Sequence, residues 1–437
     1  MVVSGKIGEG VGPQRRRATV SGLKAANSLG PREPIDFGWR LRGRTIRLLR
    51  DSSLTLLPVR QRATADLLAQ YCGDRNSLLS CLQCGVCTVN CHLAGTDGAL
   101  FPRRQMTLLQ LGEVDKLLAD PSVWLCFNCQ DCTSRCPDNA GPGRIMAALR
   151  RLAVEQNSVP RWSSRLASQR RGFLCMLLVA IALLVVAIAV GGSFSPQSSP
   201  VRYASMLPHL TLNLFFGTLA GVVMMFAAIN TARAWKAFTG ESLWEAHLGR
   251  LAYSLSSATR QIFRHRQFSE CQQFPLSRWA HIFVFYGFIT LLALAGAAAT
   301  LIALGAPYPL PVFHPFKIAG NLAAVAIIVG TLYFCVERRR PSQDRDSSSW
   351  FDWAPLVQLL LVSMTGLLAE VFRYANVDAL AYPTYFLHLA FVFVLLAGTA
   401  NSKLAHVFYR TVALIAQQYK IRSEPPVADL KSERVAA

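Results

Sequence analysis

The chain has 437 residues, of which 52% are hydrophobic, and it carries a formal net charge of +20. This length is enough for two or three domains. The charge does not favour nucleic-acid binding, because the basic residues lie in the terminal segments and between apolar segments, as in membrane proteins. Twelve cysteines in so long a chain, without an apolar signal segment at its start, favour reduced metal-binding thiols over disulfides.

The first part of the chain divides into three segments. Residues 1–45 are basic and rich in Gly and Pro, without hydrophobic periodicity, which predicts a flexible arm. Residues 46–160 show helical patterning and contain two dense cysteine runs, which predicts a soluble cytoplasmic domain. Residues 161–172 are basic and contain Trp162, a composition typical of a linker that approaches a lipid surface.

Six apolar segments follow, each close to the length of about 20 residues that a helix needs to cross a bilayer. We predict these spans at 173–190, 208–230, 280–304, 317–336, 354–370 and 381–404. Lys and Arg gather before the first span and in the connections 231–279 and 337–349, whereas the other connections are nearly free of them. This asymmetry predicts an inner (cytoplasmic) membrane protein whose termini and cysteine-rich domain face the cytoplasm. The transmembrane domain is predicted over 173–408 and a cytoplasmic tail over 409–437.

Both cysteine runs have the spacing C-x2-C-x2-C-x3-C, which is typical of bacterial ferredoxins. Three thiolates at short spacing surround one face of a [4Fe–4S] cubane, and the fourth usually reaches the other cluster. Structural zinc fits less well, because zinc sites favour C-x2-C pairs or Cys/His mixtures. The sequence therefore predicts two clusters, one held by Cys81, Cys84, Cys87 and Cys136, the other by Cys126, Cys129, Cys132 and Cys91.

Histidines near the ends of the apolar spans are candidate haem ligands, because ionisable residues are costly inside a bilayer. His388 and His406 are eighteen positions apart, about five helical turns, so one continuous helix would present both on the same face. By depth, His281 matches His406, and His209 matches His388, with His314 as a competitor of His209. This arrangement predicts two stacked b-type haems, each with axial histidines.

Four further polar residues receive weaker predictions. His247 and His265 lie in a basic connection and are expected to be solvated. Glu370 and Arg373 lie near the outer end of the fifth span, where they could exchange protons with a quinone or simply mark the membrane interface.

Roughly residues 65–415 resemble known redox proteins. The cysteine runs, with Phe101-Pro102-Arg103 and Trp124-Leu125-Cys126 between them, resemble the C subunit of heterodisulfide reductase. The apolar part resembles the E subunit of heterodisulfide reductase and the gamma subunit of respiratory nitrate reductase, and Ser402 to His406 end its last span. Their fusion on one chain resembles the QmoC family, the C subunits of the quinone-interacting membrane-bound oxidoreductase.

The resemblance implies a membrane electron-transfer subunit that works with cytoplasmic flavin and iron–sulfur subunits. Such a subunit would exchange electrons between the quinone pool and adenylylsulfate reductase in dissimilatory sulfur metabolism. Two alternatives stay open: the membrane arm of another heterodisulfide reductase-like, quinone-linked complex, and a membrane anchor without haem for an iron–sulfur domain. The expected fold is all-α, with a helical two-[4Fe–4S] ferredoxin-like domain followed by a six-helix transmembrane bundle.

Overall fold

The computed structural model describes residues 40–41, 44–45, 59–73, 76–94, 100–196, 199–265, 275–306, 309–340 and 349–421. The chain forms two compact units, one up to Leu57 and one from Pro58 onward. In the first unit, Arg40–Leu41 (β1) pairs with Arg44–Thr45 (β2) in an antiparallel register. Every other regular element in the described ranges is a helix, so the expected all-α class is confirmed. Most of the predicted arm lies outside the described residues.

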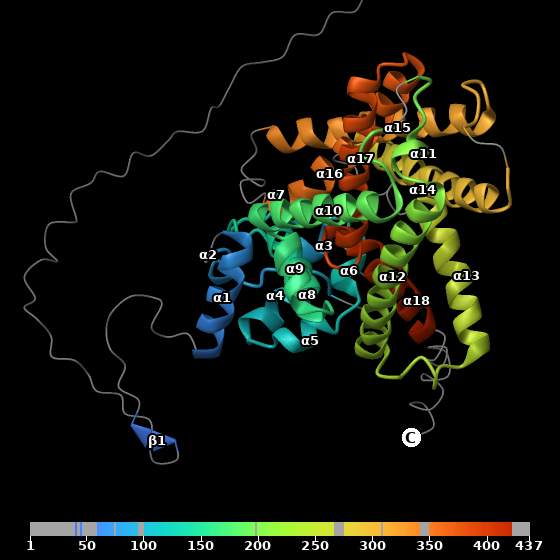
Figure 1. Ribbon diagram of the computed structural model, residues 1–437. Helices are drawn as coiled ribbons and strands as arrows, with labels where there is room; N and C mark the ends of the chain where they lie inside the picture. The colour runs from blue at the N-terminus through green and yellow to red at the C-terminus, as the bar shows by residue number, and fades with distance from the viewer. Residues whose placement is uncertain are drawn as a thin grey trace, which may run out of the picture. The chain divides into compact units, whose positions relative to one another are not determined.

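Short helices surround one long helix in the cysteine-rich part of the second unit (Figure 1). The long helix is α8 (Pro142–Asn157), and the others are α1 (Val59–Cys72), α2 (Asn76–Leu79), α3 (Val86–Val89), α4 (Arg103–Gln110), α5 (Val114–Leu118), α6 (Ser122–Leu125) and α7 (Asp131–Ser134). Helix α8 has apolar residues three and four positions apart, including Ile145, Leu149 and Leu152, which form one buried face. That face is the centre of the domain core, so α8 fixes the short helices that carry the cysteines.

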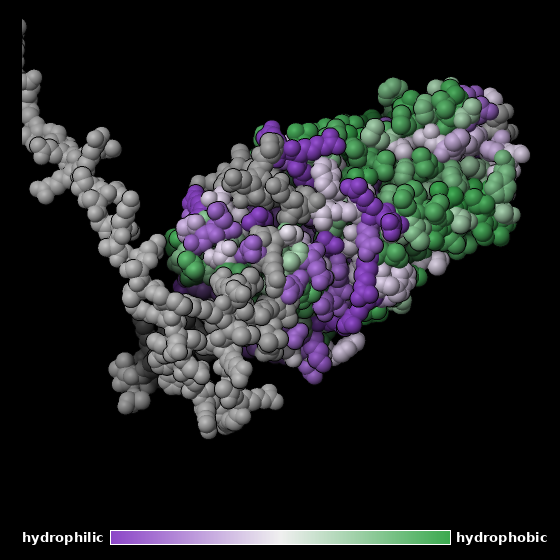
Figure 2. All heavy atoms as spheres, turned by 90° about the vertical axis from the view of Figure 1, so that its left-hand side faces the viewer, coloured by the Kyte–Doolittle hydropathy of each residue, from purple (hydrophilic) through white to green (hydrophobic). Residues whose placement is uncertain are grey.

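Among the residues that the structure describes, six helices are long and apolar enough to cross a membrane, and their number agrees with the prediction. They are α10 (Arg170–Gly191), α12 (His209–Thr239), α14 (Pro275–Ala303), α15 (Pro315–Arg339), α16 (Trp350–Tyr374) and α17 (Asp378–Thr399). Hydrophobic residues cover one end of the molecule, next to a band of hydrophilic residues (Figure 2). Leucine and valine side chains on these helices remain exposed to their surroundings, as expected where lipid replaces protein contacts.

The described part of the second unit also has five shorter helices, namely α9 (Arg161–Ala167), α11 (Tyr203–Met206), α13 (Leu248–Arg264), η2 (Lys403–Ala405) and α18 (His406–Ile421). The predicted linker 161–172 is therefore largely helical, since α9 is followed closely by α10. The predicted boundary at residue 408 falls inside α18, so residues that we assigned to a tail belong to a packed helix.

The expectation that one continuous helix carries both His388 and His406 is wrong. Helix α17 ends at Thr399, and α18 begins only at His406. Asn401 lies between them, and its side chain bonds to two other helices. It donates to Ser163 of α9 at 2.6 Å and accepts from Asn230 of α12 at 3.0 Å. Asn and Ser side chains compete in this way with backbone helix hydrogen bonds, which ends the helix there.

Helix α18 joins the cysteine-rich domain to the apolar helices. The ring of Trp124 on α6 stacks on that of Tyr409 on α18, with centroids 4.5 Å apart and planes 14° apart. Arg410 Nη1 donates a hydrogen bond to the Trp124 carbonyl at 3.2 Å. Both rings are buried in a core that also includes Trp235 of α12. We call the side of the bilayer on which this junction lies proximal, and the opposite side distal.

Replacing Trp124 with alanine is expected to loosen this junction. Loss of a buried tryptophan typically costs about 3–5 kcal/mol, because contacts with its neighbours disappear and a cavity remains. Limited proteolysis in increasing urea should show earlier cleavage between the cysteine-rich domain and α10. Trp162→Ala, at an exposed position on α9, is the matched control and should change the urea midpoint of this cleavage little. Equal urea midpoints for the two variants would show that the stack of Trp124 on Tyr409 does not stabilise the junction.

Candidate metal centres

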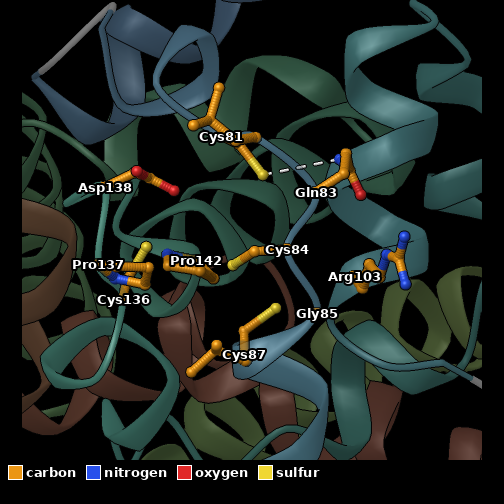
Figure 3. Close-up of a pocket in the computed structure, with 12 residues that line it drawn as sticks. Cys81, Gln83, Cys84, Gly85, Cys87, Arg103, Cys136, Pro137, Asp138 and Pro142 are labelled. Atoms are coloured by element: carbon orange, nitrogen blue, oxygen red, sulfur yellow. Dashed lines mark hydrogen bonds between the residues drawn. The ribbon is translucent and has the colours of Figure 1, made fainter.

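The first predicted cysteine set lines a single pocket. Figure 3 shows the thiols of Cys81, Cys84, Cys87 and Cys136 around it, together with Pro137 and Asp138. The amide of Gln83 donates to the Cys81 sulfur at 3.6 Å. Gln83 and Gly85 both have positive φ, 58° and 86°, and these left-handed residues turn the backbone around the pocket.

The second cysteine run repeats this backbone path. Asn128 and Gln130 occupy the positions that correspond to Gln83 and Gly85, and their φ angles are also positive, 59° and 66°. A short helix begins directly after each second left-handed residue, α3 in the first run and α7 in the second. The backbone N–H of Asn128 donates to the Cys126 sulfur at 3.4 Å. Equal spacing thus yields equal local structure, which explains why both runs turn their thiols inward.

The fourth cysteine of each run lies with the other run. Cys136 shares the first pocket, whereas Cys91 is close enough to Cys126 and Cys129 for their charges to interact. Burial is the main cause that raises the pKa of Cys91, to about 11, and neighbouring thiolates add to it. Burial also raises the pKa of Cys132, with further contributions from Cys126 and Cys129. The metal-free thiols of Cys91 and Cys132 are therefore protonated at neutral pH, and metal binding there must release protons.

Neither cysteine set has the compact geometry of a zinc site. Among the described residues, no three His, Cys, Asp or Glu side chains gather at the spacing of a single metal ion. In a zinc site each sulfur lies about 2.3 Å from the same ion. The first set instead surrounds a pocket, which is the arrangement that a multi-iron cluster requires.

His388 lies on α17 and points toward α16. Its Nδ1 is 3.1 Å from the carbonyl oxygen of Val362 and 3.2 Å from the hydroxyl of Thr365. The ring touches Gly366, where an added Cβ would lie 3.0 Å from the imidazole Cε1. An imidazole that donates from Nδ1 to a backbone carbonyl keeps a lone pair on Nε2, as in metal-binding histidines. The contacts of His388 through Nδ1 are therefore compatible with the predicted role of Nε2 as a metal ligand.

A group of histidines lies at the proximal side. His406 Nδ1 is 2.9 Å from the Lys403 carbonyl, the same type of contact that His388 makes. His281 on α14 is close enough to His406 for their charges to interact. The ring of His265 lies 5.5 Å from that of His281. These contacts bring α13, α14 and α18 together around three imidazoles.

The expectation that His265 is solvated is wrong, because its side chain is buried. His265 is the C-terminal cap of α13, and this helix folds back to bring the cap against Phe285 of α14. The amphipathic pattern of residues 248–264 is the sequence signal that could have indicated a packed helix here.

Two other histidines act as helix caps. His314 Nδ1 accepts the backbone N–H of Phe316 at 3.2 Å, and His247 Nδ1 accepts that of Arg250 at 3.4 Å. An imidazole that accepts at Nδ1 carries its proton on Nε2, so neither nitrogen offers a free lone pair to a metal. This geometry disfavours His314 as a competitor of His209, which is the first residue of α12.

Two ion pairs near these histidines were not predicted. Lys403 Nζ is 2.6 Å from Asp352 Oδ1, and this pair holds η2, whose Lys403 carbonyl positions His406. Glu370 pairs with Lys317 of α15 at 3.5 Å rather than with Arg373. The partners of both pairs are about 50 residues apart, so sequence spacing gives no signal of them.

The comparisons with known proteins concern the cysteine-rich part. Residues 77–140 match the family model described as a 4Fe-4S dicluster domain. An Archaeoglobus profundus protein similar to the C subunit of heterodisulfide reductase is 33% identical over 99 residues, covering 23% of this chain and 52% of that protein. The C subunit of a ferredoxin:CoB-CoM heterodisulfide reductase from Methanosarcina acetivorans is 36% identical over 77 residues, 17% of this chain and 30% of the relative.

Residues 77–140 therefore form a 4Fe-4S dicluster domain similar to that of the heterodisulfide reductase C subunit. The corresponding iron–sulfur subunit from Methanopyrus kandleri is 35% identical over 80 residues, and this alignment covers 18% of this chain and 41% of the relative. The chain thus spans about half the length of the first relative and less of the other two. No solved structure matches the chain. The family match ends before α10, so it leaves the apolar helices unassigned.

Proposed function

We propose that the chain is the membrane electron-transfer subunit of a quinone-linked oxidoreductase complex. It would connect the quinone pool to soluble flavin and iron–sulfur subunits through two [4Fe–4S] clusters and two b-type haems. The observation that carries this proposal is the hydrogen bond from Arg410 of α18 to the carbonyl of Cys126, a predicted cluster ligand. Helix α18 begins at His406, a predicted haem ligand. Adenylylsulfate reductase as the distant redox partner, and the cytoplasmic orientation of the cluster domain, are part of the proposal and rest on the resemblance and on loop charge.

The two cysteine sets would hold the clusters. Cys81, Cys84 and Cys87 with Cys136 would bind the first, and Cys126, Cys129 and Cys132 with Cys91 would bind the second. Cys84 is exposed and Cys126 is buried, so the first site lies nearer to solvent than the second. Clusters and haems supply one-electron chemistry when bound, and the protein positions them and tunes their potentials.

The second cysteine set adjoins the start of α18. Two arginines donate hydrogen bonds to the Cys126 carbonyl, Arg150 at 2.8 Å and Arg410 at 3.5 Å. Arg410 also lies over the ring of Phe127, 4.3 Å from its centroid. Because Arg410 follows His406 by one helical turn, a few ångströms of helix separate this contact from the imidazole. The chain itself thus supplies a short connection between the two kinds of site.

The proximal haem would be bound by His281 and His406, which the structure brings close together. The distal haem would be bound by His388 and His209. Phe215 packs on Phe393 with ring centroids 5.8 Å apart. His209 precedes Phe215 by six positions and His388 precedes Phe393 by five, so both histidines lie about 8–9 Å from this contact toward the distal side.

Quinone would react near the distal haem, where the pair formed by Glu370 and Lys317 could exchange protons with it. Asn321 also donates to Glu370, at 3.5 Å, so the carboxylate is held by two partners from α15. Glu370 follows Gly366 by one helical turn, and Gly366 touches the ring of His388. An ionisable pair at this place in an apolar bundle is a reasonable proton donor and acceptor.

The proposal is tested on protein purified from its own membranes with its associated subunits. Addition of menadiol should reduce a bis-histidine b-type absorbance, and cluster signals in electron paramagnetic resonance should follow. Iron analysis should exceed the eight atoms of two clusters by the iron of the haems. A colourless apolar domain would overturn the haem assignment and favour the anchor alternative, and zinc in place of iron would overturn the whole proposal.

A further inference from the structure

Helix α13 and the loop before it carry an exposed apolar stripe. Leu248, Leu255 and Phe263 are spaced at seven and eight positions, so they share one side of the helix, and all three side chains are exposed. Leu248 is 81% exposed, and Trp244 in the preceding loop is 97% exposed. Monomeric soluble surfaces seldom present large apolar side chains so fully in one row, and such rows mark interaction sites.

The packing of α13 fixes the direction in which this stripe faces. Ser254 and Ala258 are fully buried, and they lie on another side of the helix, against α18. Ser257 also donates to Gln418 of α18, at 3.4 Å. Small residues allow close contact with α18, whereas the larger Leu and Phe side chains point away from it. The stripe is therefore not the face that holds α13 to the rest of the molecule.

The beginning of the stripe lies beyond the hydrocarbon layer. Helix α12 has 31 residues, so it is roughly 45 Å long, whereas the hydrocarbon core is about 30 Å thick. Near its proximal end, Trp235 packs on Tyr419 of α18 with ring centroids 5.3 Å apart. Tyr419 in turn accepts the backbone N–H of His247 at 3.1 Å. Figure 1 shows α13 beside α18 and this end of α12. With the hydrocarbon layer beginning near His209, the proximal end of α12 would extend roughly 15 Å beyond it, so we expect that lipid tails do not reach Trp244 and Leu248.

The charged residues of α13 itself are all positive. Arg260 and Arg264 are exposed along the edge of α13. The preceding loop adds two carboxylates that are held by hydrogen bonds, since Glu245 accepts the Ser242 N–H at 2.8 Å and Glu241 accepts the hydroxyl of Tyr419 on α18 at 3.1 Å. A partner that covers the stripe would meet a basic rim, and complementary carboxylates would favour its association.

We propose that this surface, formed by Trp244 and the α13 stripe, is the docking site for a water-soluble protein subunit. That subunit would present an apolar patch with an acidic rim. Tryptophan and arginine are among the residues that carry most of the binding energy at protein interfaces, and exposed leucines beside them extend the apolar contact area. The inference rests on the soluble subunits in the proposed function, but it does not depend on haem or quinone.

Site-specific photo-crosslinking in the complete complex tests this inference. Leu248→p-benzoylphenylalanine should give one adduct with a soluble subunit, identified by mass spectrometry. Tyr253→p-benzoylphenylalanine is the matched control, because Tyr253 is exposed on the same helix but roughly 140° away around it. We expect at least ten times less adduct from position 253. Adducts with lipid, with a second copy of this chain, or with residues 422–437 of the same chain would each overturn the proposal.

A second measurement separates docking from folding. The double variant Trp244→Glu and Leu248→Glu should reduce the soluble subunit that co-purifies at least tenfold. Iron content and b-type absorbance per chain should match the wild type, because neither side chain contacts the metal centres. Full retention of the subunit by this variant would overturn the docking site. A wild-type complex that contains no iron would instead contradict the proposed function, so the two failures can be distinguished.

Discussion

Replacing Cys132 with alanine is expected to remove one [4Fe–4S] cluster and leave the other. Iron per chain attributable to clusters should fall from about eight atoms to about four, because each cubane holds four. The Cys132 thiol interacts with four neighbouring thiols, those of Cys126, Cys129, Cys91 and Cys87. Three remaining thiolates bind a cubane weakly, so the cluster should be lost during purification.

The matched control for this prediction is Cys72→Ala. Cys72 is also buried in the cysteine-rich domain, but it belongs to the core rather than to either thiol set. Iron analysis and electron paramagnetic resonance should show two clusters in the control and one in Cys132→Ala. Retention of both clusters by the Cys132 variant would contradict the assigned ligand set. Equal loss in the two variants would indicate a general packing defect.

Replacing His388 with alanine is expected to remove one of the two proposed b-type haems. The imidazole is held by Val362 and Thr365 with its Nε2 free, and a lost axial ligand cannot be supplied from the neighbouring Gly366. The reduced-minus-oxidised b-type absorbance should fall by about half, while cluster signals remain. Menadiol should then reduce the remaining cofactors at least tenfold more slowly, because the distal site lies next to the proposed quinone site.

His314→Ala is the control for the haem prediction. This histidine lies near the same distal side, but its Nδ1 caps α15 by accepting the Phe316 N–H. Its loss should leave the haem absorbance intact and cost about 1 kcal/mol of helix stability, as for other caps. If His314→Ala lowers the haem absorbance and His388→Ala does not, the distal ligand assignment is wrong.

The sequence determined the features that depend on short spacing or on composition. The cysteine intervals are local, and the structure shows that equal intervals produce equal turns, with Gln83 matched by Asn128 and Gly85 by Gln130. The six apolar helices also follow from composition alone, because a bilayer selects length and hydrophobicity. These features need no knowledge of which residues meet across the fold.

Tertiary structure decided the features that depend on contacts between distant residues. Asn401 ends α17 because Asn230 and Ser163 meet its side chain, and no local pattern reveals those partners. The pair of Asp352 with Lys403 is equally remote in sequence. His265 is buried because the end of α13 packs on His281 and Phe285 of α14, so its environment depends on where two helices pack. Spacing fixes local backbone geometry, whereas burial and pairing depend on the whole arrangement of helices.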